Sequence, residues 1–403
     1  MSLETGITSL TNRVGKAIND LLPDTWYQRS DLPLAQQTSI KIYKTSVMIN
    51  GKVYKNTSAT TLSLNTSSSW DRSTYATAAN RAGEDIYIYA CVPASGTVPV
   101  FKLSANSTVP TGYSASTSRK IGGFHCLCLA VGTISGHTLS GYATGDILPL
   151  SVWDLKFHAV SGSEGMIYKN GLWTDIYLAG WDGTKLVSNY CAQIADGTFG
   201  TNPANGSGFS GESLEEYASY IGKSLISRQQ FKAIAEGSNQ RTVISTKADP
   251  VTSGGHKDTA GRRMISNCGC EDCCGAMYQW TSDLFDSSVI GYDTTGGSNT
   301  QIYSHDSWYT TNKILNEHNS CDPPREESVW ETTRTSYGVQ APGYTSTGRG
   351  CGSGILLRRL VVGGSYTKSR AAYIGSRAVL GISLSSNTAS TYSTRLVSLP
   401  YYS

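Results

Sequence analysis

The sequence of 403 residues has little charge and no long apolar run, and both shortages exclude classes of function. Only 16% of the residues are charged, and 33 basic against 30 acidic residues give a formal net charge of +3. A net charge so near neutral produces no sustained positive electrostatic field that would attract nucleic acid or an anionic membrane. The longest apolar stretch, residues 121–131, is interrupted by Gly122, Gly123 and His125 and is shorter than the roughly 18 residues that span a bilayer. We therefore expect no nucleic-acid binding and no membrane insertion.

The N-terminus also lacks the features of a secretion signal. The residues after Met1 form neither a basic segment nor an apolar one. We therefore expect a soluble protein that is synthesised in the cytoplasm. In such a chain the ten cysteines are expected to be reduced, buried thiols rather than a disulfide framework.

What the sequence does contain predicts a mainly β protein with more than one domain. Its 42 glycines and abundant Ser, Thr and Asn are typical of many short strands and turns. Because 403 residues exceed the usual size of one hydrophobic core, the chain should divide. We predict an N-terminal helix within residues 1–30, a β-rich module over 31–150, and an α+β C-terminal domain over 151–403. The junction is placed at 145–154, where Pro149 interrupts a strand-like run.

The first segment carries a short stripe of apolar residues. Ile7, Leu10, Val14, Ala17 and Leu21 are spaced alternately by three and four residues, which is the period of a coiled coil. About two heptads are too few to hold a lone helix in water. The helix is therefore expected either to form an oligomer or docking contact, or to lie on its own chain.

The β-rich module shows strand and turn patterns. Strands are predicted at residues 39–44 and over 47–54, the second folded as a hairpin over an Asn-Gly pair. Residues 85–91 alternate, with Ile and Ala on one face and Tyr and Cys on the other. Residues 124–131 are almost continuously apolar, which predicts a strand buried on both faces.

The C-terminal part begins with two predicted helices. Ser213 with Glu216, and Ser227 with Gln230, have the spacing of capping boxes. The helices should end near Gly222 and Gly237. Residues 239–351 have little periodicity and should form long loops, which are usually functional.

Four motifs in this part, taken in order, resemble a known family. They are Gly275-x-x-x-x-Trp280-x-x-Asp283, Gly363-Gly-Ser-Tyr366, Gly375-Ser-Arg-Ala378 and Arg395-Leu-Val397. Together they resemble the C-type-lectin-like fold shared by formylglycine-generating enzymes and phage tropism determinants. The chain departs from the pattern where Tyr366 replaces Trp and where Ser393-Thr394 replaces Gly-Phe. For Trp280 and Tyr366 we expect buried rings with one polar contact each, and for Arg377 an internal partner such as Asp283.

The resemblance implies a phage tail-fibre protein in the virion, attached to other tail or baseplate proteins. It implies a homotrimer with a β-rich stalk and a C-terminal tip that binds a host receptor. A pilus, lipopolysaccharide or an outer-membrane protein would each suit a polar, nearly neutral surface. Residues 367–392 are rich in Tyr, Ser and Thr, the side chains of an adaptable binding surface. Carried over by position, the receptor contacts are Lys368, Arg370, Tyr373, Leu380, Ser383, Ser385 and Asn387. Two alternatives stay open: a structural baseplate or adaptor protein, and a formylglycine-generating-type oxidase.

Evidence for catalysis or metal binding is weak. The four thiols between Cys268 and Cys274 could bind zinc, or stay reduced, or pair with Cys321 or Cys351. The six histidines are scattered, and Cys351 has no cysteine neighbour for the oxidase chemistry. The tripeptides of calcium-dependent sugar-binding lectins are absent. We therefore predict no enzyme activity, no cofactor and no metal.

Overall fold

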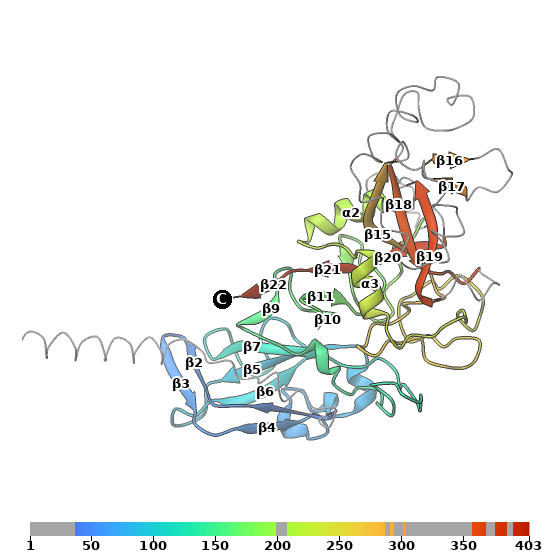
Figure 1. Ribbon diagram of the computed structural model, residues 1–403. Coiled ribbons are helices and arrows are strands. Elements are labelled where there is room, and N and C mark those ends of the chain that lie inside the picture. Colours follow the sequence, from blue (N-terminus) through green and yellow to red (C-terminus); the bar gives the residue numbers. More distant parts are fainter. Residues whose placement is uncertain are drawn as a thin grey trace, which may run out of the picture. The chain divides into compact units, whose positions relative to one another are not determined.

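The computed structural model describes residues 37–198, 208–286, 291–293, 301–303, 357–367, 375–384 and 390–402 (Figure 1). Side chains are described in 37–198, 208–283, 359–367 and 390–401. By its internal contacts the chain forms two compact units, one of residues 1–173 with 399–403 and one of residues 174–398. The helix predicted within residues 1–30 lies outside the described residues. The predicted domain boundary near residue 150 stays a prediction. At that place Pro149 opens a short 3-10 helix.

The first unit is built from short strands joined by turns and 3-10 helices. Its strands are β1 Ser39–Ile42, β2 Thr45–Ile49, β3 Lys52–Asn56, β4 Thr60–Ser63, β5 Asp85–Cys91, β6 Val100–Ser104, β7 Ser118–His125, β8 Trp153–Asp154, β9 Phe157–Ala159, β10 Met166–Lys169 and β22 Pro400–Tyr402. Its 3-10 helices are η2 Ser67–Ser69, η3 Ser73–Ala76, η4 Ala78–Arg81 and η5 Pro149–Ser151. Strands β6, β5, β7 and β8 form one sheet in that order, and β1–β4, β2–β3 and β9–β22 form two-stranded sheets.

The predicted hairpin is confirmed at the β2–β3 turn. Both turn residues, Asn50 and Gly51, have positive φ, and Ile49 pairs with Lys52 across them. An Asn-Gly pair tolerates this geometry with little strain, so the turn sets the register of the two strands.

The alternation predicted for β5 is also confirmed. Ile86, Ile88 and Ala90 belong to the main core of the first unit, which strands β1 to β7 supply. Tyr87, Tyr89 and Cys91 form a separate buried cluster on the other face. The central strand is therefore covered on both sides, as its period-2 pattern requires.

The strand predicted over 124–131 is wrong from Cys126 onward. Strand β7 ends at His125, and from Cys126 the chain pairs with irregular backbone instead of a strand. Leu127 donates to the Asp146 carbonyl and Val131 to that of Tyr142. The apolar run is buried up to Cys128, in irregular backbone after His125, whereas Leu129 and Ala130 are exposed.

The second unit combines two helices with short strands. Its elements are β11 Leu172–Asp175, which begins in the first unit, β12 Gly180–Trp181, β13 Leu186–Val187, α2 Gly211–Tyr220, β14 Ser224–Leu225, α3 Arg228–Ile234, β15 Tyr278–Asp286, β16 Gly291–Asp293, β17 Gln301–Tyr303, β18 Leu357–Gly363, β19 Gly375–Leu384, β20 Tyr392–Thr394 and β21 Leu396–Ser398. Strands β19, β18, β15 and β20 form its main sheet, on which α3 packs (Figure 1).

One predicted helix cap is confirmed and one is corrected. Ser227 caps α3, its hydroxyl accepting from the Gln230 amide while the Gln230 side chain accepts from the Ser227 amide. Helix α2 starts earlier than predicted, because Ser210 is its cap and Ser213 is the third helical residue. A serine at either place can make these bonds, so the sequence pattern allowed two starts.

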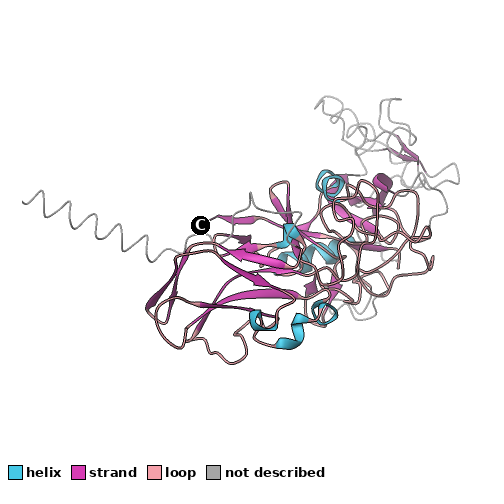
Figure 2. Cartoon of the chain, turned by 90° about the horizontal axis from the view of Figure 1, so that it is seen from below, coloured by secondary structure: helices cyan, strands magenta, loops and turns pink. Residues whose placement is uncertain are grey.

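Strands outnumber helices throughout the described chain (Figure 2). The predicted fold class, mainly β with an α+β C-terminal part, is confirmed. Within the described ranges no helix is long and apolar enough to cross a membrane.

Candidate functional site

The main sheet of the second unit carries two of the predicted receptor contacts. Leu380 and Ser383 belong to β19, which pairs antiparallel with β18, and Ser383 lies opposite Arg359. The pairing is irregular between Leu360 and Val362, and again before Gly363. The other predicted contacts lie outside the described residues: Lys368, Arg370, Tyr373, Ser385 and Asn387.

Glycines from two motifs let β18 and the start of β15 approach closely. Gly275 and Gly363 both have positive φ, and the Gly275 amide donates to the Gly363 and Gly364 carbonyls at 3.1 and 3.0 Å. A Cβ atom on Gly363 would lie 2.5 Å from the Cys273 carbonyl oxygen. Gly364 also has positive φ, so both motif glycines adopt a conformation that other residues rarely take.

Trp280, a residue of β15 in this sheet, is fully buried. Its ring stacks on Tyr392 with the ring centroids 4.8 Å apart. Its indole nitrogen has no hydrogen-bond partner within the described part of the chain, so the expected polar contact is wrong for Trp280. It is confirmed for Tyr366, whose hydroxyl lies 3.1 Å from that of Ser390. The apolar area of Trp280 therefore outweighs one unsatisfied N–H.

Asp283 has a different partner from the one predicted. Its carboxylate accepts from the Arg228 amide at 2.7 Å, at the first residue of α3. Together with Ser227 it satisfies free N–H groups at that helix end, where a negative charge is also favourable. The Arg377 side chain lies outside the described residues.

Arg395, from the last motif, is a buried cation that joins separate segments. Its guanidinium donates to the Asp175 carbonyl at 2.8 Å and also to the carbonyls of Ile176 and Glu271. Burial opposes the charge, but neighbouring thiols and the carboxylates of Asp272 and Asp175 raise the pKa of Arg395. This residue therefore has an internal structural role, although two residues of its motif are replaced.

The cysteine cluster lies in the core beside Arg395. Cys268, Cys270, Cys273 and Cys274 are all buried free thiols, and the Cys268 and Cys270 sulfurs are 4.0 Å apart. That separation is too long for a disulfide. In the described ranges no three His, Cys, Asp or Glu side chains are arranged to hold a metal ion. The proposed partners Cys321 and Cys351 lie outside the described residues.

Two adjacent acidic residues next to the thiols are buried with basic partners. Arg263 pairs with Glu271 at 2.6 Å, and His256 pairs with Asp272 at 2.9 Å. Burial raises the pKa of Glu271 in spite of Arg263. Burial acts in the same direction on Asp272, but His256, the Gly254 amide and Arg263 together lower the pKa of Asp272. These pairs fix the loop before β15, because leaving any partner alone would bury an uncompensated charge.

Two acid–base pairs, one buried and one with a half-exposed Glu215, were not predicted from sequence. Lys223 lies 2.7 Å from Asp175, and Arg359 of β18 pairs with Glu215 of α2. These partners are 48 and 144 residues apart in sequence. The one sequence signal for such a pair is an arginine within an apolar strand segment, which would have predicted that Arg359 is buried and paired.

The chain is similar to phage proteins in sequence and in structure. Residues 33–154 match the family model described as Mtd second domain. The chain is 30% identical to the tail fiber receptor-binding protein of Bordetella phage BPP-1 over 259 residues, which are 60% of this chain and 61% of that relative. The alignment thus spans less than two thirds of the relative's length.

Solved structures extend the likeness to most of the chain. The Major Tropism Determinant U1 variant covers 92% of this chain, with a TM-score of 0.61 and 23% identity, over 83% of its own length. The M1 variant gives 0.61 and 24% identity, over 92% of this chain and 82% of its own. The chain has the fold of the major tropism determinants. The resemblance carried by the four motifs is thereby confirmed.

Proposed function

We propose that this protein is the receptor-binding tail-fibre protein of a phage, which attaches the virion to the host surface through its C-terminal part. The observation that carries the proposal is the 30% identity to a protein named a tail fiber receptor-binding protein. The shared tropism-determinant fold over 92% of the chain supports it. The protein would bind without catalysis, as a component of the virion tail made in the host cytoplasm.

The proposed contact surface is the one predicted from the motifs: Lys368, Arg370, Tyr373, Leu380, Ser383, Ser385 and Asn387. Its scaffold is the sheet in which β18 joins β19 to β15. Buried glycines, Trp280 and the Arg359 pair with Glu215 stiffen this sheet. A stiff scaffold beneath adaptable polar side chains lowers the entropy lost on binding.

The proposed assembly is a homotrimer with a lectin-like tip, attached to other tail or baseplate proteins. Three copies of a weak site on one fibre would bind a surface far more tightly than one site alone. Sedimentation of the full chain tests this: a stable monomer at micromolar concentration contradicts the trimer.

The receptor would be a pilus, lipopolysaccharide or an outer-membrane protein. Labelled full-length protein should adsorb to a susceptible host, and adsorption should be lost on host mutants that lack one of these surfaces. Absence of adsorption to any susceptible host would favour a structural baseplate or adaptor role instead.

The contact surface is tested by the double variant Lys368→Ala, Tyr373→Ala. We expect adsorption to fall at least tenfold while the melting temperature and oligomeric state stay unchanged, since a few anchoring side chains carry most binding energy. The matched control replaces the exposed Lys185 and Tyr220 by Ala. Equal adsorption by both double variants would place the contact surface elsewhere.

A further inference from the structure

Two chain positions that flank the predicted receptor contacts meet in the second unit. Tyr366 follows the Gly363-Gly364 pair and Ser390 precedes β20, 24 positions further along the chain. Their hydroxyl oxygens lie 3.1 Å apart. The chain segments on both sides of residues 368–389, which contain every predicted receptor contact, therefore meet at the Tyr366–Ser390 contact.

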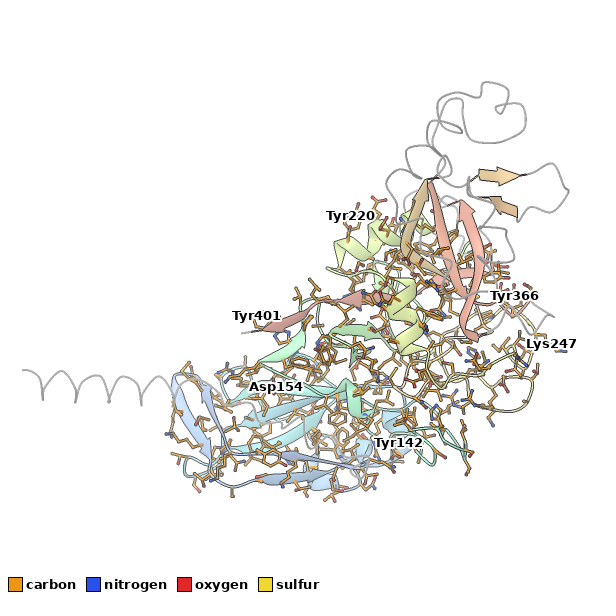
Figure 3. The ribbon with its side chains drawn as sticks, viewed as in Figure 1. Tyr142, Asp154, Tyr220, Lys247, Tyr366 and Tyr401 are labelled. Carbon is orange, nitrogen blue, oxygen red and sulfur yellow. The ribbon has the colours of Figure 1, made fainter. Side chains whose placement is uncertain are left out.

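Both positions are also tied to the start of β15. The Tyr366 amide donates to the Ala276 carbonyl at 2.9 Å, and the Tyr278 amide donates to the Thr391 carbonyl at 2.8 Å. The Tyr366 ring packs on a buried apolar cluster that includes Met277. Figure 3 labels Tyr366 among the side chains of this unit. The two chain ends are thus held by residues two positions apart, one just before β15 and one at its first residue.

A carboxyl group lies next to the two hydroxyls. The Asp249 side chain interacts with both Tyr366 and Ser390. Its backbone segment is held in place by the Ile194 amide, which donates to the Val251 carbonyl at 3.0 Å. Burial, and then the nearby Asp196 carboxylate, raise the pKa of Asp249. The Asp249 carboxyl therefore lies beside both hydroxyls, although its Oδ1 atom has no hydrogen-bond partner among the described residues.

We propose that Tyr366, Ser390 and Asp249, here called the closure cluster, position the receptor-binding residues by fixing the two chain ends of residues 368–389. The inference rests on the proposed receptor-binding function. Fixing both ends removes conformations that cannot bind, so less entropy is lost on binding. Tyr366 stands where the family motif has Trp, and only the phenol supplies a hydroxyl that both donates and accepts. The three are positioning residues, which need not touch the receptor.

The test compares full-length variants that remove one hydroxyl each. Tyr366→Phe and Ser390→Ala should each weaken adsorption to host cells by about 3- to 10-fold, the loss expected for one net hydrogen bond. The double variant should lose little more than either single variant, because both hydroxyls serve one contact. Ser390→Thr keeps the hydroxyl and should keep adsorption. Tyr220→Phe removes a hydroxyl whose hydrogen bond among the described residues is to Glu216, and should have no effect.

A second readout does not depend on any receptor. Trypsin can cut after Lys368 and Arg370, and Tyr366→Phe should speed cutting there several-fold at an unchanged melting temperature. Adsorption by Tyr366→Phe and Ser390→Ala equal to wild type would overturn the proposal. So would losses that follow a fall in melting temperature. If wild-type protein adsorbs to no host, the proposed function fails. The trypsin rates then test the closure cluster alone. Faster cutting of Tyr366→Phe than of wild type supports the cluster, and equal cutting overturns it.

Discussion

Replacing Gly275 by Ala should cost far more stability than the same change at Gly261, although the two glycines have nearly the same φ angle. Their φ angles are +77° and +79°. At Gly261 nothing lies within 4 Å of an added Cβ, so only the left-handed conformation matters, about 1 kcal/mol. At Gly275 the Cβ would lie 2.3 Å from the Thr242 carbonyl oxygen and 2.9 Å from the Val243 Cα. Backbone must move to relieve these contacts, which adds roughly 1–3 kcal/mol.

Urea unfolding followed by tryptophan fluorescence measures both changes in one transition, since both glycines belong to the second unit. The expected losses are about 1 kcal/mol for Gly261→Ala and about 2–4 kcal/mol for Gly275→Ala. Movement at Gly275 also strains its bonds to the Gly363 and Gly364 carbonyls, so adsorption should weaken for that variant alone. Equal losses for the two variants would refute the view that the motif glycine is required for close approach.

Three further outcomes are expected. Asp283→Ala should lower the free energy of unfolding by about 1 kcal/mol in urea, because α3 loses an acceptor at its first turn, whereas the exposed neighbour Ser282→Ala should change it little. Asp249→Asn should raise the melting temperature at neutral pH. Burial and Asp196 raise the pKa of Asp249 in the folded state, so ionisation of this carboxyl opposes folding. In a pH series the advantage of Asn should vanish below about pH 3.9, the pKa of Asp in an unfolded chain. Arg395→Met should cost about 3 kcal/mol or more in urea, because it removes the donor from three buried carbonyls, and a loss below about 1 kcal/mol would contradict that role.

Local patterns were most predictive where one short segment contains the whole interaction. The Ser227 cap, the Asn50-Gly51 hairpin and the alternation of β5 each depend on residues within a few positions of one another. Prediction was weaker where an apolar run was the only signal, as in residues 126–131, which leave the strand and are buried only in part. Hydropathy reports burial, while the partner of each N–H group decides whether the buried segment is a strand or a loop.

The site shows the same division. Composition and motif order were enough to predict a mainly β, nearly neutral and polar chain that resembles a lectin-like recognition fold. Three contacts became visible only in the folded chain: Asp283 caps α3, Arg395 binds the carbonyls of Asp175 and Glu271, and Tyr366 meets Ser390. Composition and short motifs depend on neighbouring residues, whereas these contacts join positions far apart in the chain. Which distant groups meet is set by how the strands pair and pack, and no local pattern contains that information.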